Sequence, residues 1–370
     1  MPMRARVNPF FAPGRHLAPA VASVREFHRM LPEYAPTPLH SCAGLATTLG
    51  LGALYVKDES QRFGLNAFKA LGASWAIEQL RRRRPGAMTL ATATDGNHGR
   101  AVAWAARRLG LPAVIFIPAC SAAARVESIR KEGARVELVE GTYDDAVQRC
   151  AEASRAHGWQ VVSDAGYEGY LEIPQWIAAG YSTLFAEADE QLKAAGLDPP
   201  NVVLVQAGVG ALLHVAVMHF RAKEVQPVLV AVEPVAADAL LSSIDSPQGD
   251  PTPTSGAQDS IMAGLNCGQV SLSAWPAVRR GVELFLTVSD PYAERAMRLL
   301  ARPAPGDPAI VAGETGAAGL AGLLAILEVP ELADAKHFLT LGRESRVMLI
   351  NTEGATDPVG YRRVVGEPVG

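Results

Sequence analysis

The sequence predicts an α/β fold in which two open, mostly parallel sheets carry helices on both faces and form a large and a small lobe. Short β-branched runs alternate with longer alanine-rich stretches, which is the pattern of parallel strands joined by helices. The chain of 370 residues is longer than one ordinary core and suits two lobes. Apolar residues make up 49% and charged residues 19%, which indicates a globular protein and excludes a disordered one.

The predicted elements follow from these runs. Buried strands are expected over 53–56, 113–117, 135–139, 202–206, 228–232 and 346–351. Helices are expected over 67–83, 97–109, 123–132, 143–156, 210–220 and 293–302. Because two strand–helix units lie in the middle third of the chain, we predict a small, mobile domain over 88–197 and a large domain formed by 1–87 and 198–370. The segment 246–256 holds three prolines and two glycines, which predicts a loop.

Composition excludes several classes of protein. The net charge of −4 gives no reason to expect a nucleic-acid partner, and the run Arg81–Arg84 reads as the solvated end of a helix before Pro85. Apolar runs stay shorter than the roughly 18 residues that a membrane span needs, and the N-terminus lacks a signal-peptide segment. The four cysteines form no CxxC pair and the histidines are scattered, which argues against a metal site. A cytoplasmic protein without membrane partners is expected.

The first candidate site is RFGLNAFK, Arg62 to Lys69, which leads into the predicted helix 67–83. Lys69 then lies in the first turn of a helix, where the helix dipole already places partial positive charge. A lysine so placed is commonly a solvated surface residue. Its apolar neighbours Phe68 and Leu71 instead indicate partial burial, which favours the neutral amine that Schiff-base formation with an aldehyde requires.

The second candidate is ATDGNHG, Ala93 to Gly99, directly before an alanine-rich helix. Its glycines and the helix start would present a row of backbone N–H groups, which bind carboxylate or phosphate. Asp95 is unusual there, because an anion competes with an anionic ligand. Two interpretations stay open: Asp95 caps the helix, or it is an acid/base group that faces the substrate.

Two further segments follow predicted strands. VQAGVGA, Val205 to Ala211, runs from a strand through a small-residue loop into a helix, which is typical of a phosphate cradle. It lacks the lysine of an ATP-binding loop and the glycine spacing of a dinucleotide site. LINTEG, Leu349 to Gly354, places Thr352 and Glu353 at a strand end, where sites of open α/β sheets gather. A simple turn explains the second segment equally well.

Together these segments resemble the fold-type II pyridoxal 5′-phosphate (PLP) enzymes and, within them, the diaminopropionate ammonia-lyases. The resemblance extends from YAPTPL at Tyr34 to NTEG at Asn351 and includes TDGNHG, QAGVG, IMAGL at Ile261 and GETGA at Gly313. RFGLNAFK and the aspartate of TDGNHG are the specific features.

The resemblance implies a role for each matching residue. Lys69 would carry PLP and remove the α-proton, with Asp95 and Asp164 as the other catalytic residues. PLP would also be held by Phe68, Asn97, Ala207, Gly208, Val209, Gly210, Ala211, Glu314 and Thr352. A neutral Thr352 hydroxyl at the pyridine nitrogen would favour elimination over transamination. Thr94, Asp95, Tyr143 and Asp164 would contact the substrate.

The activity so implied is α,β-elimination of D- or L-2,3-diaminopropionate, a small amino acid, to pyruvate and ammonia via aminoacrylate, by a homodimer. Serine, threonine or hydroxyaspartate dehydration is the alternative, as is a biosynthetic lyase or a β-replacement enzyme for another β-substituted amino acid. A catalytically inactive amino-acid-binding relative is a further possibility, which the retained Lys69 disfavours.

The two interpretations of Asp95 predict different results for Asp95→Asn. Asparagine caps a helix as well as aspartate, so a capping role predicts nearly unchanged turnover. A base for the D-enantiomer, with Lys69 serving the L-enantiomer, predicts a selective loss of about 10²–10⁴ in rate on D-2,3-diaminopropionate. Turnover of both enantiomers, with a thermal melt as the folding control, decides between them. Equal losses on both enantiomers would instead indicate recognition of the β-ammonium group.

Overall fold

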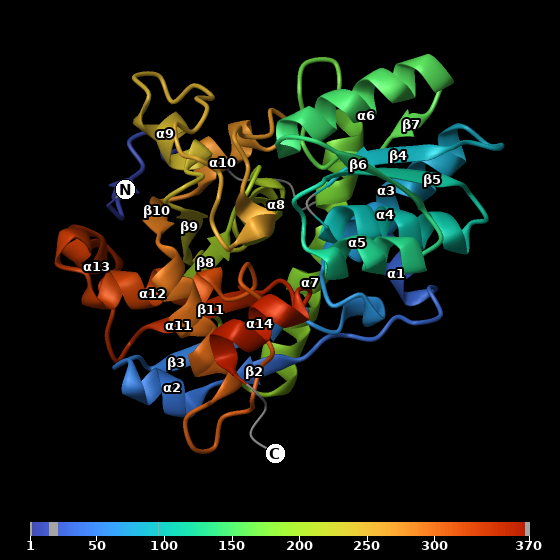
Figure 1. Ribbon diagram of the computed structural model, residues 1–370. Helices are drawn as coiled ribbons and strands as arrows, with labels where there is room; N and C mark the ends of the chain where they lie inside the picture. Colours follow the sequence, from blue (N-terminus) through green and yellow to red (C-terminus); the bar gives the residue numbers. More distant parts are fainter. Residues whose placement is uncertain (1, 15–20, 95, 367–370) are drawn as a thin grey trace.

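The chain folds around two sheets, which are separate in space and lie side by side (Figure 1). The computed structural model describes residues 2–14, 21–94 and 96–366. Within these ranges one sheet has seven strands and the other four, and most neighbouring strands are parallel. The predicted α/β class with two mostly parallel sheets is therefore confirmed.

The seven-stranded sheet has the order β1-β10-β9-β8-β11-β3-β2. Its five central strands are parallel, and the short edge strands β1 and β2 run antiparallel to their neighbours. The strands span Ala5–Val7 (β1), Leu39–Ser41 (β2), Ala53–Asp58 (β3), Val202–Gln206 (β8), Val228–Pro234 (β9), Leu284–Val288 (β10) and Arg346–Asn351 (β11). Leu349 of β11 is level with Val56 of β3 and Leu204 of β8, so these three strands end close together.

The four-stranded sheet has the order β6-β5-β4-β7 and is parallel throughout. Its strands span Leu90–Ala93 (β4), Ala113–Pro118 (β5), Arg135–Val139 (β6) and Gln160–Val161 (β7). All four lie inside the predicted small domain, 88–197, and every strand of the larger sheet lies outside it.

Helices cover both faces of each sheet. They span Val21–Arg29 (α1), Ala43–Thr48 (α2), Lys69–Arg83 (α3), Asn97–Arg108 (α4), Ala123–Lys131 (α5), Tyr143–His157 (α6), Glu172–Ala194 (α7), Ala211–Phe220 (α8), Ala239–Asp245 (α9), Trp275–Gly281 (α10), Asp290–Ala301 (α11), Ala318–Glu328 (α12), Ala333–Leu339 (α13) and Pro358–Val365 (α14). Three short 3₁₀ turns span Arg62–Gly64 (η1), Ala263–Leu265 (η2) and Pro330–Leu332 (η3). Across the described ranges, no helix combines the length and apolar character that crossing a membrane requires.

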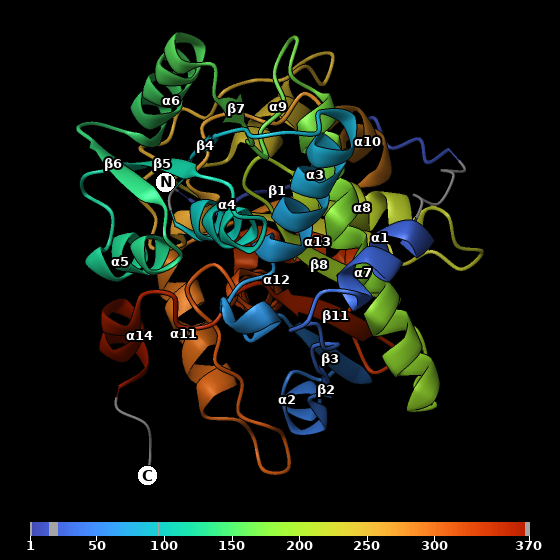
Figure 2. The ribbon, with the colours of Figure 1, turned by 90° about the vertical axis from the view of Figure 1, so that its right-hand side faces the viewer.

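The apolar core is shared between the two sheets. One cluster joins a face of each sheet through α3, α4, α7 and α8, and a second fills the other face of the large sheet with α11 and α12. A third, smaller cluster lies between α6 and the small sheet. Figure 2 shows α3 and α4 beside the small sheet and α7 continuing toward the large one. α3 lies in the predicted large domain, and it packs against α1 of that domain and against α4 and α7 of the predicted small domain. The domain boundaries at 88 and 197, and the mobility of the small domain, therefore stay predictions.

A buried ion cluster fixes the segment that leads to Lys69. Glu187 of α7 accepts from Lys57 of β3 and Arg62 of η1, each at 2.7 Å, and Arg62 also donates to Glu59 at 2.7 Å. All four side chains are at most 1% exposed, and their charges balance. The loop that they hold contains Phe63 with φ of 51°, a left-handed conformation that costs energy in a residue other than glycine.

Removal of one carboxylate from this cluster should destabilise the fold strongly. Glu187→Ala leaves Lys57 and Arg62 without their shared partner, and an uncompensated buried charge costs about 3–5 kcal/mol. Glu190→Ala, one turn along the same helix, is the matched control, since its exposed pair with Arg25 should contribute no more than about 1 kcal/mol. Denaturant unfolding measures both. Equal stability of the two variants would mean that the cluster does not hold the loop.

Candidate active site

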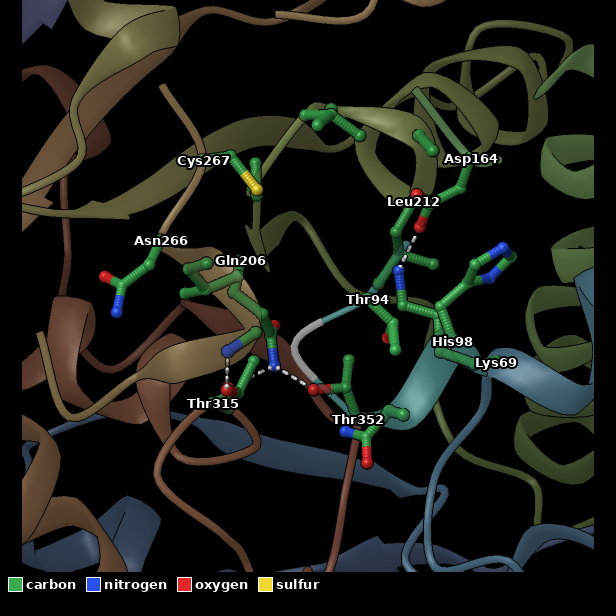
Figure 3. A pocket seen from close by; sticks show the side chains of 18 of the residues that line it. Lys69, Thr94, His98, Asp164, Gln206, Leu212, Asn266, Cys267, Thr315 and Thr352 are labelled. Carbon is green, nitrogen blue, oxygen red and sulfur yellow. Dashed lines mark hydrogen bonds and ion pairs between the residues drawn. The ribbon is translucent and has the colours of Figure 1, made fainter. Parts of the chain in front are cut away.

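A cavity lies between the two sheets, at the carboxyl ends of β4, β8 and β11 (Figure 3). Open α/β sheets bind ligands at such strand ends. Its lining residues come from both sheets and from the loop after α9: Phe68, Lys69, Ala93, Thr94, Asn97, His98, Tyr143, Asp164, Gln206, Ala207, Gly208, Val209, Gly210, Ala211, Leu212, Gly264, Leu265, Asn266, Cys267, Thr315 and Thr352. Most of the predicted site residues are thus brought together.

Lys69 is the first residue of α3, as predicted, and its side chain is 21% exposed. Its Nζ donates to Asp164 Oδ2 at 2.6 Å and lies 5.3 Å from the centre of the Phe68 ring and 5.9 Å from that of Tyr181. Figure 3 shows this ion pair at the edge of the cavity. Sequence reasoning anticipated partial burial of Lys69 but not the contact with Asp164.

Asp164 follows β7 and reaches the site from the small sheet. Burial alone would raise the pKa of its carboxyl, but the positive charge of Lys69 and the hydrogen bond that Lys69 donates outweigh burial and hold this pKa well below its usual range. Burial lowers the pKa of His98, whose Nε2 lies 2.8 Å from the carbonyl oxygen of Val162. A carbonyl only accepts, so Nε2 carries the imidazole proton. Asp164 is therefore a carboxylate beside a neutral histidine.

The predicted phosphate cradle, Ala207 to Ala211, lines the cavity at the start of α8. Gly210 has φ of 94°, which favours glycine, and it turns the chain into the helix. The first N–H groups of α8 have no acceptor within the helix, and the helix dipole adds positive potential. A Cβ on Gly208 would lie 2.8 Å from Cys267 Sγ, so only glycine lets the backbone border the cavity here.

The loop before α4 is organised by Thr94. Its Oγ1 accepts from the backbone N–H groups of Gly96 and Gly99 at 2.9 and 3.0 Å. The N–H groups of Gly96 and Gly99 are therefore engaged. A substrate carboxylate can meet the Thr94 O–H and the N–H groups at the very start of α4. Asp95 itself lies outside the described residues.

Asn97 is held from behind by Glu353. The Asn97 Nδ2 donates to Glu353 Oε2, and Glu353 also accepts from Thr356 Oγ1 and Thr315 N–H, each at 3.2 Å. Asn97 lines the cavity, whereas Glu353 is 1% exposed and lies behind it. Glu353, a candidate from the strand end, thus supports a cavity residue.

Glu314 is the predicted cofactor residue that does not line the cavity. Burial raises the pKa of its carboxyl to about 7, with the neighbouring Glu353 adding to the rise. A Cβ on Gly360 would lie 2.8 Å from Glu314 Oε1, which places this carboxyl against α14. Its predicted role in cofactor binding stays a prediction.

Tyr143 and Phe68 do line the cavity, from the start of α6 and just before α3.

Sequence reasoning missed several cavity residues. Gln206, His98 and Thr315 stand inside segments that were singled out, but no role was assigned to them. The stretch from Gly264 to Cys267 reaches the cavity through η2, far along the chain from the strand ends. The glycine in IMAGL was the available signal, because a backbone that approaches a ligand closely favours glycine.

These groups fit pyridoxal 5′-phosphate. A dianionic phosphate matches the α8 N-terminus, where Gly208 permits close approach. The Lys69 amine can meet an aldehyde, and the Thr352 hydroxyl, which lines the same cavity, can meet a ring nitrogen. The donor set therefore suits the aldehyde, phosphate and pyridine nitrogen of this cofactor.

Comparisons with known proteins agree. The family model for pyridoxal-phosphate dependent enzymes matches residues 30–350. The chain is 39% identical over 366 residues to a diaminopropionate ammonia-lyase of Salmonella typhimurium, covering 92% of this chain and 91% of that protein. The crystal structure of diaminopropionate ammonia lyase from Escherichia coli in complex with D-serine is similar with a TM-score of 0.92 and 38% identity, over 98% of this chain and 97% of that one. The same enzyme with an aminoacrylate-PLP azomethine reaction intermediate matches equally well.

Gly208→Val should weaken PLP binding. The added side chain meets Cys267 and the Gly264 carbonyl, so the loop has to move away from the phosphate. Loss of about two charge-assisted hydrogen bonds, each roughly 1.5–3 kcal/mol, predicts a dissociation constant about 10²- to 10⁴-fold higher. Gly342→Val is the control, since a Cβ there meets nothing within 4 Å. Titration of cofactor-free protein measures both, and unchanged affinity in Gly208→Val would move the phosphate elsewhere.

Proposed function

The chain belongs to the pyridoxal-phosphate dependent enzymes and, within them, to the diaminopropionate ammonia-lyases, and from this premise we propose that it catalyses α,β-elimination of 2,3-diaminopropionate to pyruvate and ammonia. The observation that carries this proposal is Lys69 paired with Asp164 at 2.6 Å in a cavity bordered by the phosphate cradle. Covalently bound PLP would act as the electron sink for the electrons released at Cα.

Lys69 has two tasks in this proposal. Its Nζ makes the covalent link to the cofactor aldehyde, which requires that the amine first lose a proton. Asp164 Oδ2 accepts a hydrogen bond from Lys69 Nζ at 2.6 Å and so orients this amine. Once the substrate amine has replaced it, the freed Lys69 amine is the base for the α-proton of the L-enantiomer, and the proposed base on the opposite face is Asp95.

The substrate carboxylate has a defined place at the start of α4. The Thr94 hydroxyl lines the cavity, and its oxygen already accepts from Gly96 and Gly99, so its proton is available to the ligand. The first N–H groups of α4 and the helix dipole add to this binding of an anion. Tyr143, from the start of α6, also lines the cavity.

The β-amino group needs a carboxylate near it. An amine leaves readily only as ammonium, and a buried carboxylate stabilises that cation. Asp164 meets this need, because the neighbouring Lys69 holds the pKa of its carboxyl well below its usual range and so keeps it ionised at neutral pH. A hydroxyl leaving group, as in serine, gains nothing from this charge, which favours diaminopropionate over the dehydratase alternative.

We also propose a cellular location and an oligomeric state for this enzyme. We place it in the cytoplasm as a homodimer. The four cysteines form no disulfide in the part of the chain that the structure describes, which is usual in a reducing compartment. Sedimentation of the purified protein tests the dimer.

A substrate panel tests the activity. The purified holoenzyme is given D- and L-2,3-diaminopropionate, serine, threonine and hydroxyaspartate, and ammonia and 2-oxo acid are measured together. Diaminopropionate should give two ammonia per pyruvate, because both amino groups are released, and it should be the preferred substrate by kcat/KM. Preference for a hydroxylated amino acid, with one ammonia per 2-oxo acid, would establish the dehydratase alternative instead.

A further inference from the structure

Gln206 is a buried amide in the wall of the cavity, and the proposed chemistry leaves it without a role. It is the last residue of β8 and is 2% exposed. Its Nε2 lies 2.8 Å from the carbonyl oxygen of Ile350, 3.0 Å from that of Thr315 and 3.3 Å from that of Gly316. It also lies 3.0 Å from Thr352 Oγ1, and Figure 3 shows the amide between Thr315 and Thr352.

The three carbonyl oxygens settle which way this amide points. A carbonyl oxygen only accepts hydrogen bonds, so the group that faces Ile350, Thr315 and Gly316 is the NH₂ and not the amide oxygen. The adjacent strands β8 and β11 set this position, since Leu204 and Leu349 pair directly. The orientation of Gln206 therefore follows from the backbone around it.

The orientation of Gln206 in turn decides the direction of the Thr352 hydroxyl. An amide NH₂ cannot accept a hydrogen bond, so Thr352 Oγ1 is the acceptor in this contact. A hydroxyl has a single proton, which then points away from Gln206. Because Thr352 lines the cavity, it presents a donor on the side where the cofactor ring would lie.

We propose that Gln206 is a positioning residue for Thr352. By donating to Thr352 Oγ1, it directs the Thr352 hydroxyl proton to the pyridine nitrogen of the cofactor, so that this nitrogen accepts a hydrogen bond and carries no proton. The inference rests on the proposed function. An unprotonated ring withdraws fewer electrons from Cα, so the electrons expel the β-amino group instead of remaining on the ring for transamination. Gln206 thereby helps to determine the reaction specificity of the site.

The test uses holoenzyme reconstituted with PLP labelled with ¹⁵N at the ring nitrogen, without substrate. The ¹⁵N chemical shift distinguishes a neutral pyridine that accepts a hydrogen bond from a protonated pyridinium. Wild type should show the neutral position. Gln206→Glu places an acceptor opposite Thr352, so the hydroxyl should turn toward it and the signal should move toward pyridinium, with more transamination per elimination. Gln248→Glu, an exposed position, is the control for the added charge.

Thr352→Val distinguishes the contribution of the Thr352 hydroxyl from that of Gln206. It removes the hydroxyl and keeps Gln206, so PLP affinity should fall about five- to tenfold, the effect of one neutral hydrogen bond. A wild-type signal at the pyridinium position would overturn the proposal, as would a folded Gln206→Glu with the wild-type shift.

Neutron diffraction of the wild-type holoenzyme applies even where Gln206→Glu does not fold. A deuterium on Thr352 Oγ1 directed at the ring nitrogen is expected, and one on the nitrogen itself contradicts the proposal. Neither measurement depends on the substrate. A failure here with normal ammonia release would therefore leave the proposed function standing, whereas protein that binds no PLP would overturn that function first.

Discussion

The site depends on the two buried salt bridges that Glu187 forms with Lys57 and Arg62. It ties a strand of the large sheet, the turn before α3 and the helix α7 into one rigid unit. The chain between Glu59 and Lys69 contains left-handed residues and could not keep its course without such support. Because α3 starts directly after this chain, the ion cluster sets where the Lys69 amine enters the cavity.

The functional groups that line the cavity come from segments that follow both sheets. The phosphate cradle follows β8 of the large sheet, and Thr94 and Asp164 follow strands of the small sheet. Lys69 starts α3, which packs against α4 and α7. Two threonine hydroxyls receive hydrogen bonds from behind, Thr94 from backbone N–H groups and Thr352 from Gln206. Each can therefore donate only forward, which is how neutral side chains give the cavity a fixed polarity.

Much of this was predictable from the sequence, and the failures have physical causes. The six predicted strands and six predicted helices are all present, with bounds shifted by three residues or fewer, because their periodicity is strong. The long helix α7 was missed, because Pro174 and Gly180 interrupt its helical sequence pattern and because apolar residues surround most of its circumference. β4 was missed because it is four residues long and Thr92 is its single β-branched residue, which is too weak a strand pattern. Lys69, Asn97 and the cradle were found as motifs. The role of Gln206 was not, because it arises from contacts with three segments distant in sequence.

The most direct test of the account is to find which lysine holds the cofactor. Borohydride reduction of the yellow holoenzyme converts the link between aldehyde and amine into a stable secondary amine, and peptide mass spectrometry then locates the phosphopyridoxyl group. We expect modification of Lys69 alone. Modification of another lysine, or of none, would contradict the assignment of this cavity as the catalytic centre.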